Sequence, residues 1–152
     1  MIDVRQAELD DAQVVLLIDM HQRHMLASSP PGTSFALDLS GLADPAVTLL
    51  AAWDGETIAA IGALKRLGGG HAEIKSMRTA PRYLRQGIAS RMLEAIIDLA
   101  RAEGLTRLSL ETGTGETFEP ALTLYRKRGF VNGSAFADYR LTDFNQCLHL
   151  AL

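Results

Sequence analysis

The chain begins with two different hydrophobic patterns in succession. Residues 2–5 alternate between apolar and charged side chains, which is typical of a strand with one face buried. The apolar residues that follow recur every three or four positions, as on one face of a helix, and Asp10 or Asp11 stands where it can cap the first turn. We therefore expect a strand followed by a helix, whose apolar positions include Val14, Val15, Leu17, Ile18 and Met25.

A proline-rich segment, residues 28–45, separates this helix from three apolar runs. It holds three of the five prolines and has no long hydrophobic period, so we expect a loop with one short helix around residues 35–42. An Asp-Gly pair, a strong hairpin signal, lies between the apolar runs 46–52 and 57–64. A glycine triplet then precedes the run 72–79. These runs predict an antiparallel meander of three strands.

The second half of the chain alternates between helix and strand. From Gly87 to about Glu103, two rows of apolar residues at helical spacing form a broad face that can pack on a sheet. Residues 105–112 alternate as a strand, and Pro120 and Gly129 mark the start and the end of another short helix. Because a strand, a crossover helix and a second strand favour parallel neighbours, we expect a mixed sheet.

Composition places the chain among globular proteins. At 152 residues, with 47% hydrophobic and 22% charged residues, we expect residues 1–152 to form one domain. The net charge of −3 argues against a general nucleic-acid binder, and no apolar run has the length of about 20 residues that a membrane span needs. The N-terminus lacks a signal-peptide pattern, so the cytoplasm is the default expectation. Cys147, the single cysteine, lies in an apolar-polar alternation that favours a strand position over a nucleophile.

A cationic stretch surrounds the start of the predicted helix at Gly87. Residues 75–93 contain no Asp or Glu. A glycine loop that opens a helix presents unpaired N–H groups and a partial positive charge, which together form an anion site. Gly87 permits close backbone approach and Ala89 keeps the first turn small, as a pyrophosphate ligand requires. The alternative, a simple turn beside a solvated basic face, stays open from this stretch alone. Its basic residues are Lys75, Arg78, Arg82, Arg85 and Arg91.

The loop matches neither of two common nucleotide motifs. No Walker loop occurs anywhere in the chain, and the third glycine of a dinucleotide fingerprint is missing. With its lead-in at residues 77–81, the loop instead resembles the acetyl-coenzyme A signature of the GNAT superfamily of N-acyltransferases, commonly written [QR]-x-x-G-x-[GA]. Gly87 and Ala89 occupy the small positions of that signature. Leu84 replaces its first residue, a departure that Arg85 and Gln86 can offset.

A second segment strengthens this resemblance. Residues 121–130 match the family pattern A-x-x-L-Y-x-x-x-G-F at every fixed position, and the two motifs occur in the expected order. The resemblance implies that Tyr125 lies beside the thiol of the cofactor. Family members often carry an Asn after the fifth strand that bonds the pantetheine arm. None occurs between Glu111 and Tyr125, so Thr112 or Thr117 replaces that contact or it is absent.

The resemblance covers nearly the whole chain and looks most like a bacterial subgroup of the family. It implies an α/β (α+β) fold, with a mixed, mostly antiparallel sheet of about six or seven strands flanked by about four helices. The strands at residues 73–79 and 106–112 would splay apart and admit acetyl-CoA as acyl donor. Backbone groups of Met77, Arg78 and Thr79 would pair with pantetheine, and Arg85, Gln86, Gly87, Ile88, Ala89 and Ser90 would hold the pyrophosphate.

The reaction that the resemblance implies is direct transfer of an acetyl group to a primary amine of a small molecule or peptide. Such a reaction uses a base for the amine, a donor for the thioester oxygen and an acid for the departing thiolate. We expect Glu73 as the base, although an exposed strand carboxylate without a catalytic task is an open alternative. A backbone N–H near Met77 or Arg78 is the candidate oxyanion donor, and Tyr125 is the candidate acid.

Other functions stay open at this point. The same fold could bind acyl-CoA as a sensor or interaction module without turnover, or could bind a different nucleotide. His21 and His24 lie three residues apart and could hold a metal, but no third ligand follows a recognisable pattern, so we expect a polar or substrate-facing role and no metal. A homodimer is an alternative to a monomer. The acceptor pocket is expected at the first helix, residues 28–45 and the C-terminal segment, whose sequences do not identify the acceptor.

Overall fold

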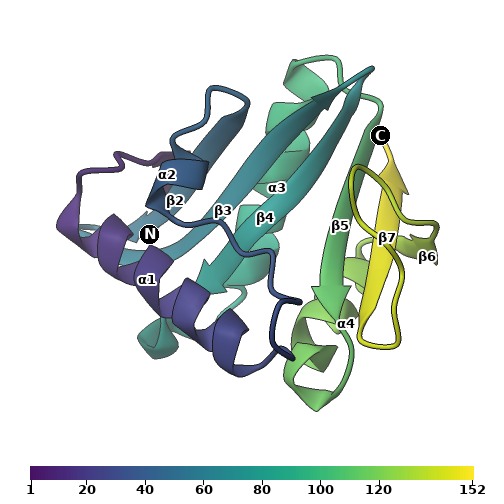
Figure 1. Cartoon of the computed structure of the whole chain (residues 1–152). Helices are drawn as coiled ribbons and strands as arrows, with labels where there is room; N and C mark the ends of the chain where they lie inside the picture. The colour runs from purple at the N-terminus through teal and green to yellow at the C-terminus, as the bar shows by residue number, and fades with distance from the viewer.

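A computed structural model describes residues 1–152, the whole chain, and shows one continuous sheet of seven strands (Figure 1). The strands lie in the order β1-β2-β3-β4-β5-β7-β6, and every neighbouring pair is antiparallel except β4 and β5. The predicted meander and the predicted mixed sheet are therefore both confirmed. The strands are β1 (Ile2–Gln6), β2 (Val47–Asp54), β3 (Thr57–Gly68), β4 (His71–Thr79), β5 (Arg107–Gly113), β6 (Val131–Gly133) and β7 (Asn145–Ala151).

Helices cover both faces of this sheet. In Figure 1, α1 crosses in front of the strands and α3 runs behind them. The carboxylate of Asp11 accepts hydrogen bonds from the N–H groups of Gln13 and Val14, which starts α1 as expected for a capping Asp. The helices are α1 (Ala12–Ala27), α2 (Leu39–Leu42), α3 (Ile88–Ala102) and α4 (Glu119–Lys127), and the 3-10 helices are η1 (Pro81–Tyr83) and η2 (Glu116–Phe118).

The short helix expected around residues 35–42 is smaller than predicted. Only Leu39–Leu42 is helical, because the side chain of Asp38 accepts the N–H of Gly41 and so starts the helix at residue 39. The stretch before Asp38 has no regular structure. This leaves a long irregular connection between α1 and β2, which borders the cleft described below.

Two hydrophobic clusters form the core, one on each face of the sheet. The larger, with 20 buried residues, lies between the sheet and α3, where Met92, Ile96 and Ile97 are fully buried. The smaller, with 10 buried residues, lies between the sheet and α1, around Val14 and Leu17. The broad apolar face predicted for α3 is thus confirmed, although the edge residues Ala89 and Leu99 are only partly buried.

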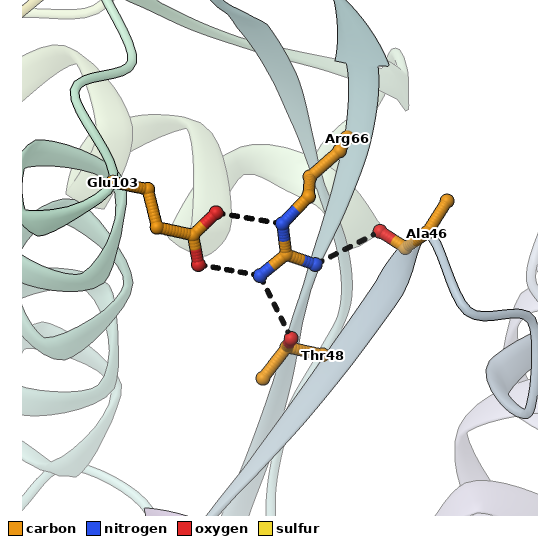
Figure 2. A network of polar contacts seen from close by, with 4 residues as sticks. All are labelled: Ala46, Thr48, Arg66 and Glu103. Atoms are coloured by element: carbon orange, nitrogen blue, oxygen red, sulfur yellow. Dashed lines mark hydrogen bonds and ion pairs between the residues drawn. The ribbon is translucent and has the colours of Figure 1, made fainter.

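A cluster of hydrogen bonds around Arg66 joins the end of β3 to the end of α3 (Figure 2). The guanidinium of Arg66 donates to both carboxylate oxygens of Glu103, at 2.6 and 2.5 Å, to the hydroxyl of Thr48 at 3.0 Å and to the carbonyl oxygen of Ala46 at 3.1 Å. The pairing with Arg66 lowers the pKa of Glu103. Because Arg66 is opposite Ala72 in the sheet, this cluster ties β2, β3 and α3 together at the end where β4 and β5 are still paired.

Candidate active site

The parallel strands β4 and β5 are paired over only a short distance. Their three residue pairs are His71 with Arg107, Ala72 with Leu108 and Glu73 with Ser109. Beyond Glu73 the strands diverge toward the lower edge of the view in Figure 1. A cleft of about 640 Å³ opens there, lined by both strands, α1, α3 and α4. The splayed strands that the resemblance implied are therefore confirmed.

A bulge interrupts β4 inside this cleft. In the pairing with β3, Lys75 is opposite Ala63 and Arg78 is opposite Ile61, so Ser76 and Met77 together oppose Gly62. Ser76 has a φ of 55°, and its buried hydroxyl has no hydrogen-bond partner in the chain. A bulge leaves a residue outside the ladder and redirects its neighbours. The candidate oxyanion donors, the N–H groups of Met77 and Arg78, follow directly after it.

The start of α3 forms the other wall of the cleft. Arg85 has a φ of 62° and Gly87, the residue before the helix, a φ of 77°, and no side chain caps the helix. The N–H groups of the first turn therefore have no acceptor within the chain. Of the predicted pyrophosphate residues, Gln86 alone does not line the cleft, because its amide donates to the carbonyl oxygen of Arg82 at 3.1 Å. The five that line it are Arg85, Gly87, Ile88, Ala89 and Ser90.

Tyr125 lies on α4 and lines the cleft. Its side chain is 5% exposed and packs edge-on against Phe130, with ring centroids 5.6 Å apart. Burial raises the pKa of the phenol, so the hydroxyl keeps its proton at neutral pH and can act as a donor. Thr112 and Thr117, the candidate replacements for the missing Asn, also line the cleft.

Glu73 is buried, which corrects the alternative of an exposed strand carboxylate. It is 2% exposed, and its Oε2 accepts a hydrogen bond from the hydroxyl of Tyr139 and one from Nζ of Lys75, at 3.2 Å. Lys75 also donates to the Tyr139 hydroxyl, at 2.7 Å. Burial, with the nearby charge of Glu73, raises the pKa of Tyr139. Both contacts of Glu73 use Oε2, so Oε1 is left without a partner in the chain.

Glu111 on β5 is a second carboxylate in the cleft, and the sequence did not assign it a role. Its Oε2 accepts from the side-chain amide of Asn145 at 3.1 Å. Burial raises the pKa of Glu111, and the hydrogen bond from Asn145 opposes this effect. Cys147, on the neighbouring strand β7, is 1% exposed and takes the strand position predicted for it.

The two histidines of α1 contact an arginine of β4. Nε of Arg78 donates to Nδ1 of His21 at 3.0 Å, and Nη2 of Arg78 is 2.8 Å from Nδ1 of His24. Because a guanidinium only donates, both Nδ1 atoms must be unprotonated acceptors. Burial, followed by the charge of Arg78, lowers the pKa of His21 from 6.5 to about 3, and the same causes lower that of His24. All three residues line the cleft, and the polar or substrate-facing role of the two histidines stays a prediction.

Comparison with known proteins agrees with this geometry. Residues 14–130 match the family model described as the acetyltransferase (GNAT) family. The chain is 46% identical over 152 residues to the uncharacterized N-acetyltransferase YedL of Escherichia coli K12, covering 100% of this chain and 96% of that one. It is 46% identical over 132 residues to the uncharacterized N-acetyltransferase YsnE of Bacillus subtilis, covering 87% of each.

Solved structures share the fold. A Klebsiella pneumoniae protein with the provisional name acyl-CoA N-acyltransferase superposes with a TM-score of 0.78 at 24% identity, over 100% of this chain and 98% of that one. A Bacillus subtilis acetyltransferase in complex with CoA superposes with a TM-score of 0.69 at 16% identity, over 100% and 99%. None of the helices is long and apolar enough to cross a membrane. The match over residues 14–130 and the 46% identity to YedL establish that this chain belongs to the GNAT family and is an acyltransferase.

Proposed function

We propose that the protein transfers an acetyl group from acetyl-CoA directly to a primary amine of a small molecule or peptide. The observation that carries this proposal is the cleft between β4 and β5, which holds an uncapped helix start, a bulged strand and a buried tyrosine. The uncapped helix start could bind a phosphate, the N–H groups after the bulge could bind the thioester oxygen, and the tyrosine could protonate the leaving thiolate. We also propose that residues 1–152 act as one domain.

The cofactor would enter through the gap between the splayed strands. Its pyrophosphate would lie on the free N–H groups at the start of α3, where the helix dipole adds a partial positive charge. Gly87 leaves room for this approach, because a Cβ on Gly87 would extend into open space. Ala89 adds only a methyl group to the first turn of the helix. The pantetheine amides would pair with the backbone of Met77, Arg78 and Thr79, which has no strand partner on the side of β5.

The chemistry would proceed by attack of the neutral amine on the thioester carbon. Oε1 of Glu73 would accept the proton that the amine loses, directly or through water, and the N–H of Met77 or Arg78 would stabilise the negative oxygen of the tetrahedral intermediate. The carbon–sulfur bond then breaks, and Tyr125 would donate its proton to the departing sulfur. The products are an amide and free coenzyme A.

A thiol-release screen tests the proposal. Purified protein is incubated with acetyl-CoA and a panel of amines, amino acids, antibiotics and peptides. Release of the free thiol is measured, and the masses of the products are determined by mass spectrometry. We expect amine-dependent thiol release and a product heavier by one acetyl group. Binding of acetyl-CoA without thiol release or an acetylated product across the panel would exclude the proposal and favour a non-catalytic acyl-CoA sensor.

A further inference from the structure

Arg78 is a partly buried cation of the cleft that has no anionic partner. Lys75, the other cation on this part of β4, contacts Glu73 at 3.2 Å, but none of the ion pairs of the chain includes Arg78. Burial lowers the pKa of its guanidinium. Moving a cation out of water costs free energy unless an anion compensates its charge. An anionic ligand bound at this position would therefore be stabilised by Arg78.

The contacts with α1 fix the orientation of this guanidinium. Nε and Nη2 of Arg78 each direct one N–H to a histidine nitrogen, at 3.0 Å for His21 and 2.8 Å for His24. A guanidinium has five N–H donors, so both donors of Nη1 and one of Nη2 have no partner in the chain. These two nitrogens form an edge that suits two parallel hydrogen bonds to a carboxylate.

The free edge of Arg78 lies on the side of the sheet that faces α1, away from the proposed pyrophosphate position. Met77, the preceding residue, points the opposite way, because a Cβ on Gly62 would approach both Met77 and Met92 of α3. Arg78 instead contacts α1. The start of α3, where the pyrophosphate would bind, is on the Met77 side. The anion held by Arg78 is therefore part of the acceptor rather than of the cofactor.

The two carboxylates of the cleft suit the other end of such an acceptor. Glu73, which pairs with Lys75, and Glu111 line the same cleft, and Arg85 lies just before the start of α3, on the cofactor side. We propose that Arg78, oriented by His21 and His24, binds a carboxylate of the acceptor, whose amine faces Glu73 and Glu111. The acceptor is then an amine that also carries a carboxylate, with free amino acids as the simplest members. This inference rests on the proposed function and narrows its substrate class.

Matched acceptors that differ only in the carboxylate test this inference. Each of a set of amino acids is compared with its amide and with the aminoalkylphosphonate of the same carbon skeleton, and kcat/KM is measured at saturating acetyl-CoA. We expect the amino acid to exceed its amide by roughly 10- to 100-fold, as the loss of a charged hydrogen-bonded pair implies. Equal use of amino acid and amide would overturn the inference, and a preference for the phosphonate would identify a phosphate-type acceptor instead and also overturn it.

Two substitutions of Arg78 connect that preference to its side chain. Arg78→Met removes the charge and should raise KM for amino acids and abolish their preference over amides, while the Kd of acetyl-CoA changes by less than about threefold. Arg78→Lys keeps the charge but cannot make two parallel hydrogen bonds to a carboxylate, so it should retain part of the preference. It replaces Arg78→Met as the test variant if Arg78→Met does not fold. Arg23→Met is the matched control, because Arg23 is on the solvent side of α1 and pairs only with Asp19. Reduced acetyl-CoA binding with an unchanged acceptor preference in either Arg78 variant would assign Arg78 to the cofactor.

Calorimetry with coenzyme A separates this inference from the proposed function. If no amine in the screen is acetylated, the proposed function fails, but the carboxylate site can still be measured as amino-acid binding to the protein saturated with coenzyme A. Binding of amino acids that is lost in Arg78→Met would support the carboxylate site without turnover. No binding of any amino acid to the coenzyme A complex, together with no turnover, would overturn both.

Discussion

The buried side chain of His21 should make the protein less stable as the pH falls below 6.5. Its Nδ1 accepts a hydrogen bond from Arg78, and Arg78, His24 and Lys75 are the charged or titratable groups that act on it. Burial and these groups lower its pKa from 6.5 to about 3 in the folded protein. The unfolded chain therefore binds a proton at His21 between pH 6.5 and about pH 3 that the folded chain does not bind.

The sign and the size of the effect follow from this difference. Well above pH 6.5, His21 is unprotonated in both states and its titration does not change the free energy of unfolding. Below pH 6.5 the free energy of unfolding falls, because protonation of His21 favours the unfolded chain. Each pH unit in this window corresponds to about 1.4 kcal/mol. Between pH 8 and pH 5, His21 should thus remove about 2 kcal/mol of stability.

Urea unfolding followed by circular dichroism at several pH values measures this contribution. His21→Asn keeps an acceptor for Arg78 and cannot titrate, so its free energy of unfolding should fall by about 2 kcal/mol less than that of the wild type between pH 8 and pH 5. His24→Asn is the control, since His24 is exposed and should change the pH dependence much less. Parallel curves for wild type and His21→Asn would refute the reasoning, because they would mean that His21 titrates alike in both states.

Three further substitutions test the assignment of one cofactor-binding residue and two catalytic residues. Gly87→Val should weaken acetyl-CoA binding in calorimetry without unfolding the protein, and Gly104→Val is its control, because both glycines have φ near 75° (77° and 74°) and open space where a Cβ would lie. Glu73→Gln should lower turnover on the order of 10²-fold at nearly constant acetyl-CoA affinity, whereas activity within about threefold of wild type would exclude Glu73 as the base. Tyr125→Phe should lower turnover by roughly 10- to 10³-fold, or about 1.4 to 4 kcal/mol of barrier, with little change in melting temperature. Normal turnover with a much lower melting temperature would make Tyr125 a structural residue.

The sequence predicts most of the fold because the elements depend on local patterns. The hairpin between β2 and β3, the amphipathic face of α3 and the short helix α4 each follow from hydrophobic period, Gly or Pro within one segment. The splay of β4 and β5 followed from the family resemblance, and no local pattern predicts it. Element ends were less accurate, as the start of α2 shows, since one side-chain hydrogen bond of Asp38 decides it.

The site contained features that local patterns could not predict, because they join distant segments. Tyr139 reaches Glu73 across 66 positions, and Arg78 reaches His21 across 57. The alternation of β4 indicates which side of the strand Glu73 is on, but not that Tyr139 and Lys75 surround it. The sequence does indicate that His21 and His24 share a helix face, because they are three residues apart. It does not indicate that Arg78 of β4 contacts both of them.

The bulge at Ser76 explains how one strand serves both sides of the cleft. Ile74 belongs to the cluster under α3, while Lys75 points to the α1 side, where it contacts Tyr139 and acts on His21. Regular alternation from Lys75 would put Met77 on the α1 side and Arg78 under α3. The extra residue reverses this order, so that Met77 packs toward α3 and Arg78 joins Lys75 on the α1 side. The left-handed φ of Ser76 and its unpaired hydroxyl are the cost of that reversal, which places the candidate carboxylate-binding arginine on the same side of the strand as the candidate base.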